Sequence, residues 1–393
     1  MIKLYSAFTN EIDHPQAAAQ DILAQLKPEQ NMQKNTVGIL HFYYEFSETG
    51  AYQAVKDALP FPVAGCISSY IGTSGQSGDA VLSVMMITGD DICFDIQTVE
   101  NAGSKSREQI DEEIGQIFAA FCSNEKPKLV MPFLPQLGHF SGSDLVAAVN
   151  MLPQNLPLFG TVTFNSENVA DSHHVLGGGK ISSDMLAFVA FYGEFEPKFR
   201  LISSFAFYDG FGEVAEVTDA EGSILKKVNG ISALKYLKKQ GMIAESGLDT
   251  LVPAILTYPD GTKVVRGFFG VTEGTENIVA AGNMEVGTKI MFADLNGEKT
   301  LASTEKLFKE VTQAKENGVI AYSCAARAWS LGSKFYIETQ KIAECAEEYQ
   351  LKNAVPLDYC VAYSGGEICP VYDDNGNMVN VLHNYTLISC ALC

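Results

Sequence analysis

Three polar clusters follow apolar segments in the last third of the chain, at 322–327, 363–368 and 382–387. The first contains Arg327 shortly after a hydrophobic strand, and the second contains Glu367 directly after a pair of glycines. A guanidinium presents a planar fork of hydrogen-bond donors, whereas an ionised carboxylate presents only acceptors. Together, the two side chains could hold both ends of a small zwitterion, so the clusters predict a binding site for a small polar metabolite.

The expected ligand site also draws on neutral groups from both halves of the chain. Hydroxyl and amide groups would supply further hydrogen bonds, and glycines would let the backbone approach the ligand closely. The residues expected to bind the ligand are Gly65, Cys66, Ser68, Ser69, Cys324, Arg327, Tyr363, Ser364, Gly366, Glu367, His383 and Asn384. Open α/β sheets bind ligands beyond the carboxyl ends of their strands, where these clusters are expected to lie. Binding is expected to bias two domains toward a closed state.

Two of these residues also allow a catalytic interpretation. Cys66 and Cys324 each stand where a strand meets a loop, and either could be a nucleophile with His383 or Glu367 as its base. The sequence favours the simpler interpretation, a small buried thiol, because nothing indicates a lowered pKa, and no catalytic residue is assigned. Arg327 has a structural alternative too, an ion pair with Glu367 or another carboxylate. A scaffold that binds no ligand is a third interpretation.

Four short motifs resemble known sites but lack the context that those sites require. The glycine pattern at 210–215 is followed by strand and turn residues, whereas a dinucleotide site needs a helix there. The segment 177–180 lacks the first glycine of a phosphate-binding loop. The histidines at 173–174 would point to opposite faces of a strand, and the cysteines at 390 and 393 have no second pair of ligands. We therefore expect neither a metal nor a cofactor.

The composition is that of a globular protein with an acidic surface. The chain has 393 residues, of which 47 are acidic and 27 basic, so its net charge is −20. Such a surface repels phosphate backbones and anionic lipids, which makes nucleic acid and membrane surfaces poor partners. The first residues lack the apolar region of a signal peptide, and no apolar run is long enough to span a bilayer. The nine cysteines are expected to be buried thiols. These features predict a cytoplasmic location without membrane insertion.

The elements that must position the clusters recur in a pattern of strand, helix, strand, polar loop and strand. The three copies begin at 36–43, 128–133 and 318–324. Strands that are nearly all apolar, alternating with helices, predict an α/β protein with mixed sheets flanked by helices. A glycine-rich segment at 208–212 suggests a boundary between two domains, 1–208 and 209–393. A long helix is expected from 331 to 349.

Several of these segments resemble the FIST family, named for F-box and intracellular signal transduction proteins. The segments that carry the resemblance are Val63–Cys66 with Ser68 and Ser69, Asn229–Leu234, Ile278–Gly282, Ser323–Cys324 with Arg327, Gly366–Ile368, and His383–Asn384 with Thr386–Leu387. Ile67 interrupts the Gly-Cys-Ser-Ser run that is usual in the family, which affects the ligand-binding loop. The resemblance implies a FIST N-like domain over 1–208 and a FIST C-like domain over 209–393.

The resemblance also implies a sensory protein that binds a small ligand, with an amino acid or a small carboxylate as the expected ligand. FIST regions are often joined to signalling domains, but FIST-like segments occupy this chain from end to end. Signalling is therefore expected to pass through a partner protein in trans, or through rearrangement of a homo-oligomer. The alternative function is that of a cysteine-dependent enzyme acting on a small metabolite.

Overall fold

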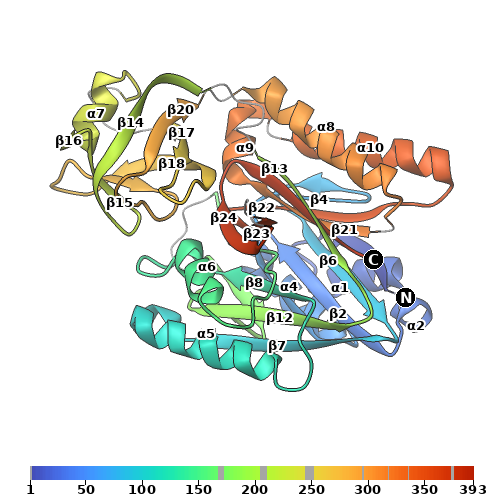
Figure 1. Cartoon of the computed structure of the whole chain (residues 1–393). Coiled ribbons are helices and arrows are strands. Elements are labelled where there is room, and N and C mark those ends of the chain that lie inside the picture. The colour runs from blue at the N-terminus through green and yellow to red at the C-terminus, as the bar shows by residue number, and fades with distance from the viewer. Residues whose placement is uncertain are drawn as a thin grey trace.

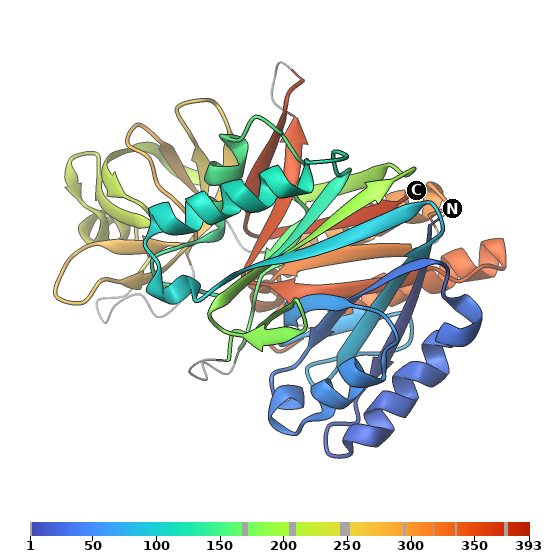
Figure 2. The ribbon, with the colours of Figure 1, turned by 90° about the horizontal axis from the view of Figure 1, so that it is seen from below.

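The computed structural model describes residues 2–166, 172–203, 210–243, 252–293, 296–316, 318–334, 336–372 and 376–393. Within these ranges the chain forms a body of three six-stranded mixed sheets, and a smaller antiparallel barrel lies at one end of the body (Figure 1). Helices cover the outer faces of the sheets, as Figure 2 shows for the blue and teal helices. The predicted class, α/β with mixed sheets flanked by helices, is confirmed.

The first sheet carries its helices α1 (Pro15–Leu26) and α4 (Ala51–Ala58) on the outer face, with the short α2 (Pro28–Asn31) and α3 (Glu45–Glu48) beside them. In spatial order, its strands are β1 (Lys3–Thr9), β6 (Leu82–Gly89), β2 (Asn35–Phe42), β3 (Val63–Ile67), β10 (Val175–Gly177) and β11 (Lys180–Ser182). The neighbours β2 and β3 are parallel, and the other pairs are antiparallel.

The second sheet is covered by α5 (Arg107–Phe121) and α6 (Gly142–Asn150). In spatial order, its strands are β7 (Ile92–Glu100), β12 (Met185–Gly193), β8 (Leu129–Leu134), β9 (Gly160–Val162), β23 (Gly366–Tyr372) and β24 (Met378–His383). Again one pair, β8 and β9, is parallel. A capping box begins α5, because Ser106 and Gln109 exchange side-chain and backbone hydrogen bonds.

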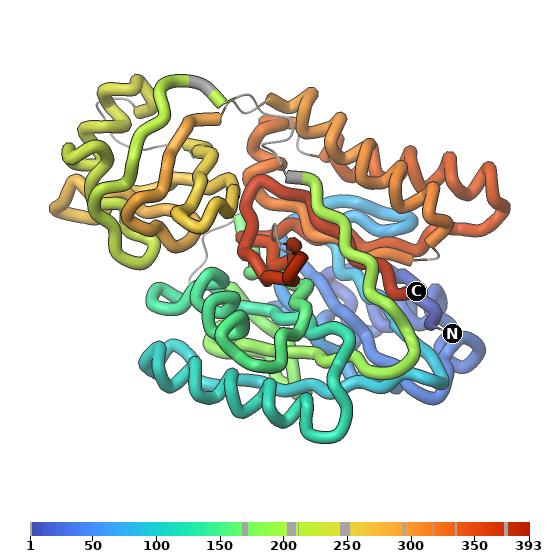
Figure 3. The backbone as a smooth tube through the Cα atoms, in the orientation of Figure 1, coloured from blue at the N-terminus to red at the C-terminus, as the bar shows by residue number. Residues whose placement is uncertain are grey.

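The third sheet is covered by α8 (Gly297–Gln313) and α10 (Ile337–Asn353). In spatial order, its strands are β13 (Pro197–Ser203), β25 (Thr386–Leu392), β21 (Gly318–Cys324), β22 (Asp358–Ser364), β4 (Ile71–Thr73) and β5 (Ser77–Gly78). Its parallel pair is β21 and β22, and Figure 3 shows β13 running beside the red β25. The long helix expected from 331 to 349 begins later: a separate short helix, α9 (Ala325–Ser330), precedes α10.

The inner faces of the three sheets share one hydrophobic core, which explains why their strands are apolar on both sides. In β8, for example, Leu129, Met131 and Phe133 enter the shared core. Val130 and Leu134 point the other way and pack beneath α5 and α6. Alternate side chains of a strand point to opposite faces, so a strand buried on both faces has no polar positions to spare.

Each sheet receives its last two strands from a segment that crosses over from another sheet. The hairpin of β4 and β5 follows β3 in the chain but joins β22. The strands β10 and β11 follow β9 of the second sheet in the chain, but β10 pairs with β3 of the first. The hairpin of β23 and β24 follows β22 but joins β9. The two halves of the chain therefore share sheets. The boundary expected at 208–212 begins outside the described residues, so the division into 1–208 and 209–393 stays a prediction.

The barrel is an insertion between β13 and α8. Its elements are β14 (Gly210–Glu221), β15 (Ile224–Val228), β16 (Ile231–Ser232), α7 (Ala233–Lys239), β17 (Val252–Thr257), β18 (Lys263–Val271), β19 (Ile278–Ala280) and β20 (Lys289–Ala293). Pairing of β14 with both β20 and β15 closes the sheet. The barrel has its own core, to which Val381 of β24 adds a contact from the body.

Candidate functional site

The predicted site residues separate into four groups, and the first group holds the crossing segments together. Ser68 Oγ donates to the carbonyl of Tyr70 at 2.8 Å and lies 3.0 Å from the carbonyl of Tyr363, whose N–H it also accepts at 3.0 Å. Ser69 Oγ donates to Asn165 Oδ1 at 3.2 Å. The structure thus places Ser68 against Tyr363, with one crossing segment bonded to the next.

Gly65, predicted to let a ligand approach, instead lets two strands approach. Its φ is 153°, and a Cβ there would lie 1.9 Å from the carbonyl oxygen of Leu40 in β2. No side chain fits in that space, so packing alone requires a glycine at this position.

The second group surrounds Cys66 in the shared core, at a distance from solvent. His41 Nδ1 lies 3.3 Å from the carbonyl of Cys66 and 3.7 Å from its sulfur, and His41 Nε2 lies 3.3 Å from the Tyr322 hydroxyl. Burial lowers the pKa of His41 to about 4, so the ring is neutral at pH 7. Burial also raises the pKa of Cys66 far above its usual value. A neutral histidine that donates from Nδ1 and accepts at Nε2 satisfies this arrangement as a core network, which opposes a nucleophilic role for Cys66.

The third group centres on Arg327, whose guanidinium is fully buried and ion-paired with Glu338 at 2.8 Å. Its Nη2 also donates to the carbonyl of Thr300 and to the hydroxyls of Ser303 and Thr304. The expectation that Arg327 and Glu367 hold opposite ends of one ligand is therefore corrected in favour of the structural alternative. The carboxylate comes from the first turn of α10, which begins later than the sequence indicated.

Glu338 is also fully buried and completes this network of hydrogen bonds. It accepts from the hydroxyls of Ser323 and Thr304 at 2.8 Å each and from Tyr363 at 2.6 Å. Burial on its own raises the pKa of Glu338, but Arg327 and these hydroxyls outweigh that effect and leave the pKa below its ordinary value. Sequence reasoning missed Glu338, although its position in a predicted helix offered no signal beyond that of any helical glutamate.

The fourth group contains Glu367, the one predicted charge that remains without an opposite charge among the described residues. Its side chain is fully buried, and Thr386 donates to Oε2 at 2.6 Å. Its Oε1 accepts no hydrogen bond of ordinary geometry, although the Cys324 thiol and the Ser364 hydroxyl lie close enough to affect its pKa. Ser364 accepts from Thr161 at 2.7 Å and from the N–H of Gly366 at 3.0 Å.

Burial dominates the electrostatics of this cluster. Burial raises the pKa of Glu367 to about 8, against the smaller lowering effects of Thr386, Cys324 and Ser364. The carboxyl is therefore mostly protonated at pH 7. Burial, and then the neighbouring Glu367, raise the pKa of Cys324 well above its usual value. Both groups are therefore neutral at pH 7. A cation placed beside them would favour ionisation of Glu367.

The remaining predicted residues, His383 and Asn384, connect this cluster to the barrel. Arg266 of β18 donates from Nη1 to the carbonyl of Leu382 at 2.8 Å and to Asn384 Oδ1 at 3.1 Å. His383 is the cross-strand partner of Glu367, and its Nε2 lies 3.2 Å from the Cys369 carbonyl. Burial lowers the pKa of His383 to about 3, which makes the ring a weak base.

The barrel covers this end of the body. Val265 of β18 packs with Cys324, Ala326 and Tyr385 in one small cluster. Tyr385 has a φ of 58°, a left-handed conformation that is uncommon for an aromatic residue and often marks a functional turn. Figure 1 shows β23, β24 and α9 between the barrel and the rest of the body.

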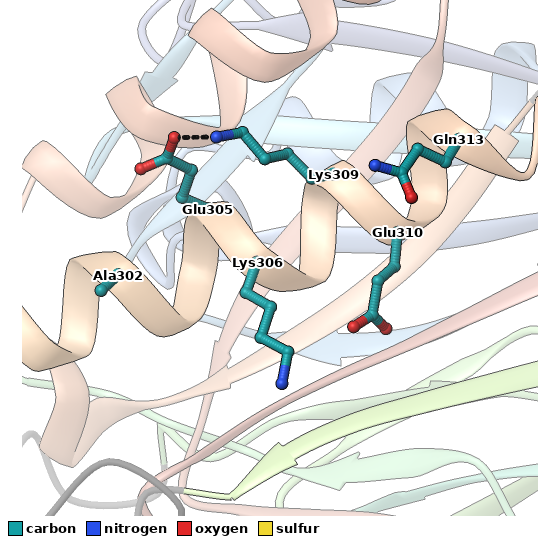
Figure 4. Close-up of a pocket in the computed structure, with 6 residues that line it drawn as sticks. All are labelled: Ala302, Glu305, Lys306, Lys309, Glu310 and Gln313. Atoms are coloured by element: carbon teal, nitrogen blue, oxygen red, sulfur yellow. Dashed lines mark hydrogen bonds and ion pairs between the residues drawn. The ribbon is translucent and has the colours of Figure 1, made fainter.

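Two hollows described on the surface lie elsewhere, on the helices of the third sheet. The larger, about 470 Å³, is lined by six residues of α8 (Figure 4), among which Glu305 contacts Lys309. All six come from one helix, so this hollow has no opposing wall to enclose a ligand. The second lies between α8 and α10 and includes Cys345 and Tyr349. Neither contains a predicted site residue, and no described helix has the length and apolarity needed to cross a membrane.

The fold and the polar cluster define an α/β protein with a buried acidic site beneath an inserted barrel. Comparison with protein families gives the identity: the FIST N domain matches residues 36–231, and the FIST C domain matches residues 233–370. The chain therefore belongs to the FIST family, which is associated with signal transduction and small-ligand sensing. The FIST N match extends into the barrel as far as β16.

Other comparisons add little. A search of the curated proteins returned no match to this chain. Among solved structures, PurLQS from Thermotoga maritima matches with 9% identity and a TM-score of 0.22, over 100% of this chain and 72% of that chain. Phosphoribosylformylglycinamidine synthase II from Thermotoga maritima matches with 8% identity and a TM-score of 0.20, over the same shares. Likenesses this weak support no conclusion about fold or function.

Proposed function

We propose that this protein senses an amino acid or another small metabolite with an ammonium group, bound at Glu367 beneath the barrel. The observation that carries the proposal is the buried carboxyl of Glu367, which has one oxygen without a hydrogen bond and no opposite charge among the described residues. A carboxylate in such a place is costly unless a cation pairs with it. Cys324, Ser364 and Thr386 would complete the contacts to the ligand.

Ligand binding would be coupled to the position of the barrel. The barrel residue Val265 covers Cys324, and the barrel residue Arg266 contacts the chain on both sides of His383. A ligand that enters beside Glu367 would change these contacts and so favour one arrangement of barrel and body over another.

The signal would pass to a partner protein in trans through α9. Cys324 caps the N-terminus of this helix, and Trp329 near its C-terminus is 56% exposed. Trp329 contacts Phe164 with ring centroids 6.1 Å apart, so a shift of α9 would alter an exposed aromatic surface. Rearrangement of a homo-oligomer would be the alternative means of output.

Thermal-shift screening against amino acids, small carboxylates and amines tests the proposal. A ligand at a hundredfold its Kd should stabilise the parent protein by about 2.7 kcal/mol, and Glu367→Gln should abolish the shift. Glu316→Gln is the control, because Glu316 is also buried but pairs with Arg200 in a different part of the body. Equal shifts in the parent and in Glu367→Gln would contradict the proposed site.

Calorimetry would identify the charge of the bound group. If an ammonium group pairs with Glu367 at pH 7, the carboxyl must lose its proton, so binding should release close to one proton per site. Heats measured in buffers of different ionisation enthalpy report that release. Binding without proton release would exclude a cation beside Glu367.

A second candidate function is that of a cysteine-dependent enzyme, which the contact between Cys324 and Glu367 favours. The thiol and the Glu367 carboxyl are both protonated at pH 7, so Glu367 would have to lose its own proton before it could act as the base for Cys324. Alkylation followed by peptide mapping distinguishes the two functions. The exposed Cys93 and Cys393 should react in either case, whereas fast, metabolite-blocked reaction of Cys324 would favour the enzyme.

A further inference from the structure

Arg266 differs from the other arginines of the chain in having no carboxylate partner within the described ranges. The chain has four arginines. Arg107, Arg200 and Arg327 form ion pairs with acidic side chains, whereas Arg266 donates only to a backbone carbonyl and to an amide oxygen among the described residues. It is 4% exposed, and its Nε–H has no acceptor in the part of the chain that the structure describes. A buried cation left in this state is costly, which points to an anion that occupies the position in another state of the protein.

The free side of the guanidinium lies against the backbone of Gly282, so an anion would reach Nε only in a state in which Gly282 has moved away. Gly282 has a φ of 144°, and a Cβ there would lie 2.7 Å from Arg266 Nε and 3.0 Å from Ser143 Oγ. Any side chain at 282 would therefore cover the unpaired edge of the arginine. Ser143 accepts from the N–H of Asn283 at 3.2 Å, which leaves its own hydroxyl hydrogen for a further acceptor.

The charges around this edge of Arg266 also suit an anion. Ser143 lies in the first turn of α6, and the N-terminus of a helix stabilises negative charge. The nearby acid is Asp144, whose Oδ1 is paired with Arg107 at 2.9 Å and accepts from Asn283 at 3.1 Å. Because Arg107 already pairs with Asp144, Asp144 does not serve as the counter-charge of Arg266.

We propose that Arg266 is the carboxylate-binding residue of the ligand site, acting through the Nε side of its guanidinium with Ser143 beside it. This inference rests on the proposed function, because it assigns the second end of the same ligand. Arg266 and Glu367 both contact the segment 382–386, Arg266 through Leu382 and Asn384, and Glu367 through Thr386. A ligand with an ammonium group at Glu367 and a carboxylate at Arg266 would join the body to the barrel.

Isothermal titration with three matched ligands tests this assignment: an amino acid identified by the screen, its amide and its decarboxylated amine. The parent should bind the amino acid at least about 10-fold more tightly than either derivative, since a hydrogen-bonded charge pair contributes a factor of about 10 to 100. Arg266→Met should remove this preference and leave the affinity for the amine unchanged. Arg266→Lys keeps the charge but not the fork, and should restore only part of the preference.

Lys263→Met is the matched control, because Lys263 is an exposed cation on the same strand and its loss should change none of the affinities. If Arg266→Met does not fold, Arg266→Lys and Ser143→Ala provide the same comparison. An unchanged preference for the amino acid in the Arg266 variants, or equal binding of amino acid and amine by the parent, would overturn the assignment while the proposed function stands. Failure of the parent to bind any of the ligands would overturn both.

Discussion

Breaking the buried pair of Arg327 and Glu338 should strongly destabilise the protein, because either charge left alone in the interior lacks a counter-charge. Both side chains are fully buried. Removing one partner of such a pair typically costs about 3–5 kcal/mol. We therefore expect Arg327→Met and Glu338→Gln each to lose free energy of unfolding in this range. The double variant should lose clearly less than the sum, because it leaves no unpaired charge.

The way in which the stability of Arg327→Met depends on pH distinguishes loss of the charge pair from loss of packing. In the parent, the pKa of Glu338 is lowered, so its contribution to stability is present above its unfolded pKa, near the usual 4.5 of a glutamate, and is lost as the pH falls through the folded pKa. Without Arg327, burial should raise that pKa instead. The stability of the variant should then fall as the pH rises, so its deficit relative to the parent should be larger at pH 8 than at pH 5.

Urea unfolding followed by circular dichroism and by Trp329 fluorescence measures these quantities. Trp329 is the single tryptophan of the chain and lies on the same short helix as Arg327, so it reports directly on this region. Lys306→Met on the outer face of α8 is the control for loss of one positive charge, with an expected change below about 0.5 kcal/mol. Additive losses in the double variant, or a deficit independent of pH, would refute the reasoning.

Three further predictions follow from the structure. Because the folded pKa of Glu367 is raised to about 8, the parent should lose up to about 1.4 kcal/mol of stability per pH unit from this group between its unfolded pKa and pH 8. In a series of urea-unfolding measurements at different pH, Glu367→Gln should flatten the dependence of stability on pH in this range. An unchanged slope would contradict the raised pKa. Gly65→Ala should abolish soluble expression or cost several kcal/mol, because its Cβ would overlap the Leu40 carbonyl, whereas Gly138→Ala, where nothing lies within 4 Å, should leave the melting temperature within about a degree. Binding of a ligand beside Glu367 should shift the emission of Trp329, and a saturating ligand that leaves the emission unchanged would contradict the proposed route through α9.

The sequence predicted the fold class well because the physical signals were local. Strands such as β8, apolar on both faces, indicate sheets buried between layers wherever they occur in a chain. The exchange of hairpins between sheets was not predictable, since Ser68 gives no sign in the sequence that it will bond to the backbone of Tyr363, far along the chain. Pairing at such separations depends on the whole topology.

The candidate site was predicted in part, for a related reason. The sequence singled out Glu367 and Cys324, and the structure places them together. It assigned Arg327 to the ligand because the late start of α10, which delivers Glu338, could not be located from periodicity. Arg266 carried a similar signal, a guanidinium within an apolar strand, but was overlooked because its contact, the turn at 382–384, belongs to another part of the fold.

The position of β25 has a consequence for synthesis of the protein. This strand lies between β13 and β21, so residues 386–392 must leave the ribosome before the third sheet can form. Until then a nascent chain presents two apolar strands with open edges, which is the kind of surface that chaperones cover and that associates with other unfinished chains. A chain whose translation stalls before residue 386 should therefore aggregate and should not form a folded third sheet.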